Sequence, residues 1–338
     1  MADSEYARRP QDFYGAGGIV SQLEVEIAEL MGKEAAVFMP SGTMAQQIAL
    51  RIWCDRAGNS RVAFHPTCHL ELYEHHAYRE LHRLESVLLG EPSRLFTLAD
   101  LEAVHTPVAA VLVELPQREI GGQLPMWDDL TGVHEWAANR GVRLHLDGAR
   151  LWECAPYYGR PYSAIAAMFD SVYVSFYKIL GGLPGAMLAG PADFVAEAKV
   201  WQRRHGGNLH TLAPNAIAAK IGIDRHLPRI PAYCRKAAEI ADALRGVEGL
   251  AIVPEHPPTN MMHLHFSGDL EAIEDAVYEV ARETRLLLFA RLNRSAEGVG
   301  VVELAVGEHS LEIDTAEIRE LMEQAVARGR NPRSPAAG

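Results

Sequence analysis

Three stretches of the sequence place chemically reactive side chains beside apolar runs and small residues. In the stretch VRLHLDGARLW at 142–152, an apolar run ends on Asp147, and two small residues separate this aspartate from Arg150. We predict that the run is a buried strand, which puts Asp147 at the sheet edge where open α/β folds bind ligands. A carboxylate at that edge can keep the nitrogen of a bound pyridine ring protonated. The alternative is a helix-capping aspartate that pairs with Arg150.

Lys178 lies in the stretch SVYVSFYKILGGLPGAMLAG at 171–190, directly after an apolar run and shortly before two glycines. Charged side chains are seldom buried without a partner or a task. Loss of water lowers the pKa of a lysine amine, which makes the amine a nucleophile suited to Schiff-base chemistry. The glycines allow the backbone to approach a ligand closely. The alternative is a lysine at a strand end that reaches solvent.

A turn with phosphate-binding character occurs in MPSGTMAQQIAL at 39–50, where Ser41, Gly42 and Thr43 precede a predicted helix. Unpaired backbone N–H groups and the positive end of the helix dipole favour an anion there. The turn is not a P-loop, because the GxxxxGK[ST] spacing is missing. The alternative is an ordinary helix cap without a ligand.

The order of these stretches is informative. A phosphate turn comes first, then the aspartate, then a lysine about thirty residues later, each at the end of a predicted strand. A pyridoxal phosphate enzyme of the aspartate-aminotransferase-like fold needs its phosphate site, ring-nitrogen partner and Schiff-base lysine in this order.

Short apolar runs alternate with amphipathic stretches and predict the elements that position these residues. The predicted strands are buried and parallel, and they lie at 35–39, 109–115, 142–146, 171–176 and 185–190. The predicted helices lie at 21–31, 43–54, 126–140 and 192–204. This alternation indicates a doubly wound α/β fold with a mostly parallel sheet.

The order of predicted strands and helices changes after about residue 235. A helix at 235–246, strand-like runs at 250–255, 261–266 and 300–306, and a helix at 314–327 predict a smaller α+β domain. We therefore expect four segments, which are a flexible segment at 1–12, a large domain at 13–234, a small domain at 235–330 and a disordered tail at 331–338.

Composition limits the possible partners. The 338 residues carry a formal net charge of -12, which does not favour binding to nucleic acid or to an anionic membrane. No apolar run approaches the roughly 20 residues of a membrane helix. The four cysteines form no CxxC pair and the N-terminus shows no signal segment. We expect a cytoplasmic protein with reduced thiols that acts on a small molecule.

The chain resembles the low-specificity L-threonine aldolases and their β-eliminating lyase relatives over roughly residues 13–330. The resemblance is carried by four stretches, FYGAGGIVSQLEVEIAELMGKEAAVFMPSGTMAQ at 13–46, LHLDGARLW at 144–152, YKILGG at 177–182 and WQRRHGG at 201–207. It implies pyridoxal phosphate as the cofactor in a fold type I enzyme. By this resemblance Lys178 is the Schiff-base lysine and Asp147 the ring-nitrogen partner. Arg150 lies near the cofactor oxygen and the substrate carboxylate.

The resemblance assigns further residues. Ser41, Gly42 and Thr43 match the phosphate turn. His69 matches a histidine that stacks on the ring and could act as a base. Arg203 matches a basic residue that reaches a phosphate, often across a subunit boundary. Tyr14 matches a loop that borders the neighbouring site. Homodimers or homotetramers with shared sites are therefore expected.

The histidine-rich run at 65–76 has two other interpretations. It could be a surface helix with assorted histidines. A metal site built from His65, Cys68, His69 and His75 ranks last, because the spacing matches no common zinc pattern. We therefore expect no metal.

Departures from the family pattern concern the substrate. The family's ENTHN segment is replaced by ELPQREIGG at 114–122, which lacks the histidine, so Gln117 or Arg118 is expected to face the site. Glu303 falls where the family has the arginine that holds the substrate carboxylate. Arg118, Arg150 or Arg291 could take over that role, the substrate could differ, or the alignment could slip by a few residues.

The expected reaction is the retro-aldol cleavage of a threonine-like β-hydroxy-α-amino acid to glycine and an aldehyde. The enzyme would be a carbon-carbon lyase. One alternative keeps the cofactor and changes the reaction to β-elimination or to a transaldol transfer. Another is a non-catalytic binding protein that retains the fold.

Overall fold

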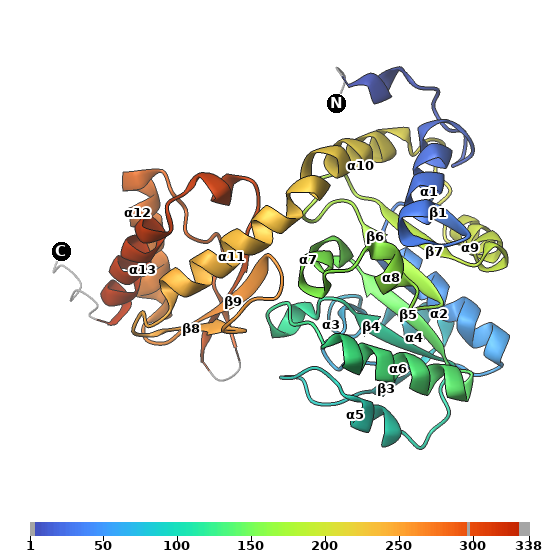
Figure 1. The fold of residues 1–338 in the computed structure, drawn as a ribbon, viewed down its shortest axis with the longest axis horizontal. Helices are drawn as coiled ribbons and strands as arrows, with labels where there is room; N and C mark the ends of the chain where they lie inside the picture. Colours follow the sequence, from blue (N-terminus) through green and yellow to red (C-terminus); the bar gives the residue numbers. More distant parts are fainter. Residues whose placement is uncertain (1–3, 296–297, 331–338) are drawn as a thin grey trace. The chain divides into compact units, whose positions relative to one another are not determined.

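The computed structural model describes residues 4–295 and 298–330, and these form two compact units (Figure 1). The first unit comprises the chain up to Glu119 together with Leu124–Pro228, and the second comprises Ile120–Gln123 and the chain from Arg229 onwards. The predicted tail at 331–338 and the first three residues of the predicted N-terminal segment lie outside the described residues. The predicted domain limits remain predictions.

The chain alternates helices and strands along most of its length. The strands are β1 (Ala35–Met39), β2 (Arg61–Phe64), β3 (Glu85–Leu88), β4 (Ala110–Glu114), β5 (Arg143–Gly148), β6 (Ser171–Ser175), β7 (Ala186–Gly190), β8 (Leu250–Val253), β9 (Met261–Phe266), β10 (Asn293–Arg294) and β11 (Gly300–Ala305). The α-helices are α1 (Gly18–Met31), α2 (Gly42–Ala57), α3 (His69–Leu72), α4 (Ala77–His82), α5 (Leu98–Glu102), α6 (Trp127–Arg140), α7 (Ala155–Tyr158), α8 (Tyr162–Ala166), α9 (Ala192–Arg204), α10 (Ala213–His226), α11 (Ile230–Leu244), α12 (Leu270–Thr284) and α13 (Thr315–Arg330). The 3₁₀-helices are η1 (Glu5–Arg8), η2 (Arg118–Ile120), η3 (Leu151–Glu153), η4 (Leu227–Arg229) and η5 (His309–Glu312).

The first unit is built on a seven-stranded sheet with the order β1-β7-β6-β5-β4-β2-β3. Neighbouring strands are parallel except at β7, which is antiparallel to both β1 and β6. The prediction that 185–190 is a parallel strand is therefore wrong. Parallel neighbours need a long crossover, and the short segment between β6 and β7 contains no helix, so the chain reverses. The mostly parallel sheet of the predicted fold class is confirmed.

Helix α2 packs against most strands of the seven-stranded sheet, and it begins at the predicted phosphate turn. Its first turn is capped by Ser41, whose side-chain oxygen accepts a hydrogen bond from the backbone N–H of Met44 at 3.3 Å. The helix is buried on nearly every side, and it packs on α9 and on the central strands. Polar side chains on such a helix need hydrogen-bond partners inside the protein. The neighbouring Gln46 and Gln47 are both 2 % exposed.

The second unit has its own sheet and core. The order of its antiparallel strands is β10-β11-β9-β8, and helices α11, α12 and α13 surround a separate apolar cluster. This confirms the predicted small α+β part of the fold class. In the part of the chain that the structure describes, no helix combines the length and apolar character needed to cross a bilayer.

Candidate active site

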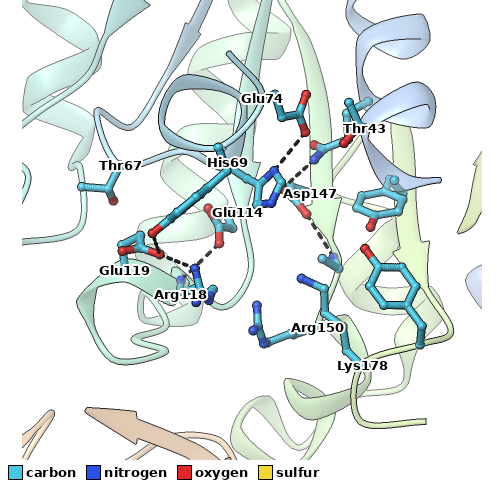
Figure 2. Close-up of a pocket in the computed structure, with 16 residues that line it drawn as sticks. Thr43, Thr67, His69, Glu74, Glu114, Arg118, Glu119, Asp147, Arg150 and Lys178 are labelled. Atoms are coloured by element: carbon cyan, nitrogen blue, oxygen red, sulfur yellow. Dashed lines mark hydrogen bonds and ion pairs between the residues drawn. The ribbon is translucent and has the colours of Figure 1, made fainter. Parts of the chain in front are cut away.

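A pocket of about 420 Å³, including its open mouth, lies where β1, β2, β4, β5 and β6 end in the first unit (Figure 2). The carboxyl ends of these strands meet at one edge of the sheet, which brings residues distant in sequence together. The pocket is lined by Gly42, Thr43, Gln46, Thr67, His69, Tyr73, Glu74, Glu114, Arg118, Glu119, Asp147, Ala149, Arg150, Tyr173, Tyr177 and Lys178.

Asp147 lies near the end of β5 and is only 2 % exposed. Its Oδ2 accepts a hydrogen bond from Gln46 Nε2 at 2.8 Å, and its Oδ1 accepts one from the backbone N–H of Ala149 at 3.0 Å. These two donors fix the carboxylate at the pocket wall. A buried carboxylate held in this way can face a cationic ring nitrogen.

Lys178 follows β6 and is the only lysine among the described residues that line the pocket. Burial lowers the pKa of its amine, and the nearby positive charge of Arg150 lowers it further, whereas Asp147 opposes the shift. A lysine amine with a lowered pKa carries its lone pair more often at neutral pH, so it can attack a carbonyl carbon.

Glu114 was not predicted as a site residue, and it places a second carboxyl group beside Asp147. The two residues are partners in the register of β4 and β5. Glu114 accepts hydrogen bonds from the backbone N–H of Arg118 at 3.2 Å and from Gln117 Nε2 at 3.1 Å. Burial raises the pKa of the Glu114 carboxyl above its usual range, and repulsion from Asp147 adds to the increase. The site therefore favours a proton on Glu114.

His69 begins α3 and is connected to the interior of the protein through Glu74. Its Nδ1 lies 2.9 Å from Glu74 Oε1, and Glu74 Oε2 accepts a hydrogen bond from Gln47 Nε2 at 2.9 Å. The Glu74 side chain is 2 % exposed, whereas the His69 side chain is 40 % exposed. The His69 ring therefore lines the pocket, and the buried Glu74 carboxylate fixes its orientation (Figure 2).

Two arginines line the pocket near Lys178. Arg118 forms an ion pair with Glu119 and stacks over the ring of Tyr73, with 5.4 Å from the guanidinium carbon to the ring centre. Tyr73 in turn donates a hydrogen bond from its hydroxyl to Glu119 at 2.9 Å. Figure 2 shows Arg118 and Arg150 on the same side of the pocket as Lys178, and both arginines lower the pKa of its amine. This side of the pocket suits anionic groups.

The N-terminal end of α2 closes the pocket at Gly42 and Thr43. A Cβ atom at Gly42 would lie 2.0 Å from the hydroxyl oxygen of Tyr173, so only glycine leaves room for that tyrosine. The first backbone N–H groups of a helix have no partner within the helix and can bind a phosphate.

These features fit pyridoxal phosphate. The pocket is lined by the N-terminal end of α2 at Gly42, by the carboxylate of Asp147 and by Lys178. In addition, Gln46 Oε1 is buried and has no hydrogen-bond partner within residues 4–295 and 298–330, so a polar atom of a ligand could satisfy it.

The structure brings together seven of the residues that the sequence predicted for the site. These are Gly42, Thr43, His69, Arg118, Asp147, Arg150 and Lys178. Ser41 does not line the pocket but caps α2 behind it. Gln117 is 2 % exposed, and it donates to Thr67 Oγ1 at 3.2 Å as well as to Glu114.

Four predicted residues are not among the residues that line this pocket of the first unit. Tyr14 is 50 % exposed and packs edge-on against His210, and Arg203 is exposed on α9. Arg291 and Glu303 belong to the second unit, where Glu303 pairs with His263 in the register of β11 and β9.

Among residues 4–295 and 298–330, no group of three or more His, Cys, Asp or Glu side chains is arranged to hold a metal ion. His65 binds protein groups instead, with Nδ1 2.8 Å from Thr67 Oγ1 and Nε2 2.8 Å from the carbonyl oxygen of Arg94.

Sequence reasoning missed several residues that line or support the pocket. They are Gln46, Gln47, Thr67, Tyr73, Glu74, Glu114, Glu119 and Tyr173. One signal was present, because two adjacent glutamines interrupt an apolar stretch at 44–50 directly after the phosphate turn. Burial of both faces of that helix would have implied buried amide partners.

Comparison with known proteins agrees with the geometry. Residues 3–267 match the family described as beta-eliminating lyase. Low-specificity L-threonine aldolase 1 of Arabidopsis thaliana is 27% identical over 287 residues, which covers 82% of this chain and 80% of that protein. A Listeria monocytogenes crystal structure, provisionally assigned as an L-allo-threonine aldolase, has a TM-score of 0.92 and 41% identity, and the match covers 97% of this chain and 91% of that one. An Exiguobacterium structure, provisionally assigned as an aromatic amino acid beta-eliminating lyase/threonine aldolase, has the same TM-score of 0.92 and 41% identity, with 96% and 92% covered.

Proposed function

This chain belongs to the β-eliminating lyase family and is a pyridoxal-phosphate-dependent lyase of fold type I, and from that premise we propose that it cleaves a threonine-like β-hydroxy-α-amino acid to glycine and an aldehyde. One observation carries the proposal. The pocket holds a proton acceptor, His69, that is separate from the lysine and is oriented by a buried carboxylate. Retro-aldol cleavage needs such a base, because the β-hydroxyl must lose its proton as the carbon-carbon bond breaks.

The cofactor would be held by residues of one pocket. Lys178 would bind its aldehyde carbon, Asp147 would pair with its ring nitrogen, and the α2 end at Gly42 and Thr43 would bind its phosphate, since all four residues line the pocket. We also propose that His69 stacks on the ring and that Arg150 pairs with its phenolic oxygen. Pyridoxal phosphate, when bound, supplies the ring that accepts the electron pair of the broken bond.

The chain's own residues supply the proton transfers. His69 accepts the proton of the β-hydroxyl, and a positioned base of this kind contributes roughly 10²–10⁴-fold to the rate. Asp147 keeps the ring nitrogen protonated through its fixed carboxylate. Glu114, which favours its protonated form, leaves Asp147 as the principal negative charge at this wall.

We propose that Arg118 holds the substrate α-carboxylate. Glu119 and the ring of Tyr73 hold its guanidinium at the pocket, beside Arg150 and Lys178. A guanidinium fork matches a carboxylate in shape and charge. Arg118 is thus the best supported of the three arginines that could replace the arginine missing at Glu303. Gln117 supports this wall through its hydrogen bond to Glu114.

Replacing Arg118 with glutamine is expected to raise KM for the amino acid about 10–100-fold, because a hydrogen-bonded charge contributes about 1.5–3 kcal/mol. The value of kcat should change much less. Steady-state kinetics with purified enzyme would measure both constants. Arg140→Gln, at an exposed position on α6, serves as the control. A loss confined to kcat would contradict the assignment.

The reaction itself is tested by its products. The enzyme with pyridoxal phosphate and L-threonine or L-allo-threonine is expected to form glycine and acetaldehyde in equal amounts. Formation of 2-oxobutyrate and ammonia would instead support β-elimination, an activity named for the Exiguobacterium relative. A new β-hydroxy amino acid formed in the presence of a second aldehyde would support transaldol transfer. Cofactor binding without turnover of any tested amino acid would support a binding protein.

We further propose a homodimer or homotetramer in the cytoplasm. Tyr14 and Phe13 are 50 % and 65 % exposed beside His210, and Arg203 is exposed on α9. The exposed rings of Phe13 and Tyr14 suit a contact with a second subunit. All four cysteines are thiols in the structure, as a reducing compartment would require.

A further inference from the structure

Two adjacent glutamines on α2 serve two different carboxylates of the pocket. Gln46 donates from Nε2 to Asp147 at 2.8 Å, and Gln47 donates from Nε2 to Glu74 at 2.9 Å. Both glutamines are 2 % exposed. A buried amide that binds a buried carboxylate costs little only when both groups are satisfied. The first turns of α2 therefore position a second carboxylate in addition to Asp147.

Each oxygen of the Glu74 carboxylate contacts one partner. Its side chain is 2 % exposed, Oε2 accepts from Gln47, and Oε1 lies 2.9 Å from His69 Nδ1. An ionised carboxylate can only accept hydrogen bonds. When Glu74 is ionised and the His69 ring is neutral, the proton in this contact lies on Nδ1, and Nε2 carries none.

The position of the unprotonated Nε2 of His69 matters for the reaction. His69 and Glu74 both line the pocket that contains Lys178 (Figure 2). A histidine whose Nδ1–H binds a carboxylate has one defined acceptor nitrogen, and the carboxylate stabilises the positive ring after that nitrogen takes a proton.

We propose that Glu74 is a positioning residue for the reaction, itself held by Gln47, which fixes His69 with Nε2 towards the pocket and stabilises the imidazolium that forms. This inference rests on the proposed function for the identity of the proton, which moves from the substrate β-hydroxyl to Nε2. A proton is later delivered to Cα of the product glycine, so the cleavage is balanced without an added reactant. Gln47, Glu74 and His69 thus form a chain that ends in the base.

The test replaces Glu74 with glutamine, which keeps the size of the side chain. The new amide would direct a donor towards either Gln47 or His69, so the chain of hydrogen bonds cannot form as before. We expect kcat to fall about 10²–10³-fold with KM within about threefold, since loss of an orienting carboxylate costs about 10⁴ in a serine protease triad. Glu80→Gln, exposed on α4, is the matched control.

A second readout does not depend on turnover. The enzyme with ¹⁵N-labelled histidine is examined by NMR, and the His69 signals are identified by their absence in His69→Gln. The native enzyme should show the tautomer protonated at Nδ1, and Glu74→Gln should show a mixture or the Nε2 tautomer. If the tautomer and kcat both stay unchanged, the proposal is overturned.

Gln47→Ala covers the case in which Glu74→Gln does not fold. It keeps the carboxylate but removes its support, so the tautomer should shift in the same direction with a smaller loss of kcat, about tenfold or more. An unchanged tautomer in Gln47→Ala would overturn the role of Gln47. A shifted tautomer in an enzyme that forms no glycine would overturn the proposed function and leave the positioning role of Glu74 in place.

Discussion

Lys178→Ala is expected to abolish the covalent attachment of pyridoxal phosphate and to lower kcat by about 10⁴-fold or more. The reason is that Lys178 is the only lysine that lines the pocket in the described part of the chain. Burial and Arg150 lower the pKa of its amine, which keeps the nucleophilic form available at neutral pH. An alanine offers no nitrogen, and the surrounding arginines cannot substitute because a guanidinium stays protonated.

Borohydride reduction followed by mass spectrometry measures the attachment directly, since the reduced cofactor stays on the chain. Lys33→Ala is a demanding control. Burial also lowers the pKa of Lys33, but its amine donates to the carbonyl oxygen of Phe169 and does not line the pocket. The adduct should survive in Lys33→Ala and vanish in Lys178→Ala. An adduct that persists without Lys178 would place the attachment on another residue.

The residues that the apolar pattern alone predicted share one property, which is their position at a strand end. Asp147 and Lys178 each follow an apolar run, and Gly42 follows another. In a doubly wound sheet the carboxyl ends of the parallel strands meet at one edge, so local pattern is enough to bring these residues together. The structure places all three in one pocket.

The supporting residues could not be predicted in the same way. Glu114 ends an apolar run as Asp147 does, but its contact with Asp147 depends on which strands are neighbours. The pairings of Gln46 with Asp147 and of Gln47 with Glu74 join segments whose distance in space no local period encodes. The direction of β7 was also missed, because a fully buried antiparallel strand has the same continuous apolar pattern as a parallel one.

Glu303 shows a different limit. An arginine is expected at that position by resemblance, and sequence alone left open whether another arginine replaces it, the substrate differs or the alignment slips by a few residues. We propose Arg118 for this role, because Glu119 and Tyr73 hold its guanidinium at the pocket. Such an arrangement depends on side-chain packing around η2 and could not be read from the order of residues.

Asp147→Asn is expected to lower kcat about 10²–10³-fold, the range typical for loss of one fixed electrostatic group in an active site. Asparagine has nearly the same shape, but it carries no negative charge. Its side chain also has only one acceptor oxygen, whereas Gln46 and Ala149 donate to two different oxygens of Asp147. The ring nitrogen of a bound cofactor would then lose the carboxylate that favours its proton. Steady-state kinetics and a pH titration of the cofactor's visible absorption would measure both effects, and Asp193→Asn, at an exposed ion pair, is the control.

The same substitution should also act on Glu114. Repulsion from Asp147 is the second cause of the raised pKa of Glu114, after burial. The neutral amide in the Asp147→Asn variant would remove that repulsion, so the pKa of Glu114 should fall, although burial would keep it above its usual value. Infrared or ¹³C NMR titration of the carboxyl group should therefore show Glu114 losing its proton at a lower pH in Asp147→Asn than in the native protein. If the pKa of Glu114 is the same in both proteins and kcat stays within about threefold, the charge of Asp147 does not control the protonation of Glu114 or the rate of the reaction. In that case the pairing of Asp147 with the ring nitrogen would have to be abandoned.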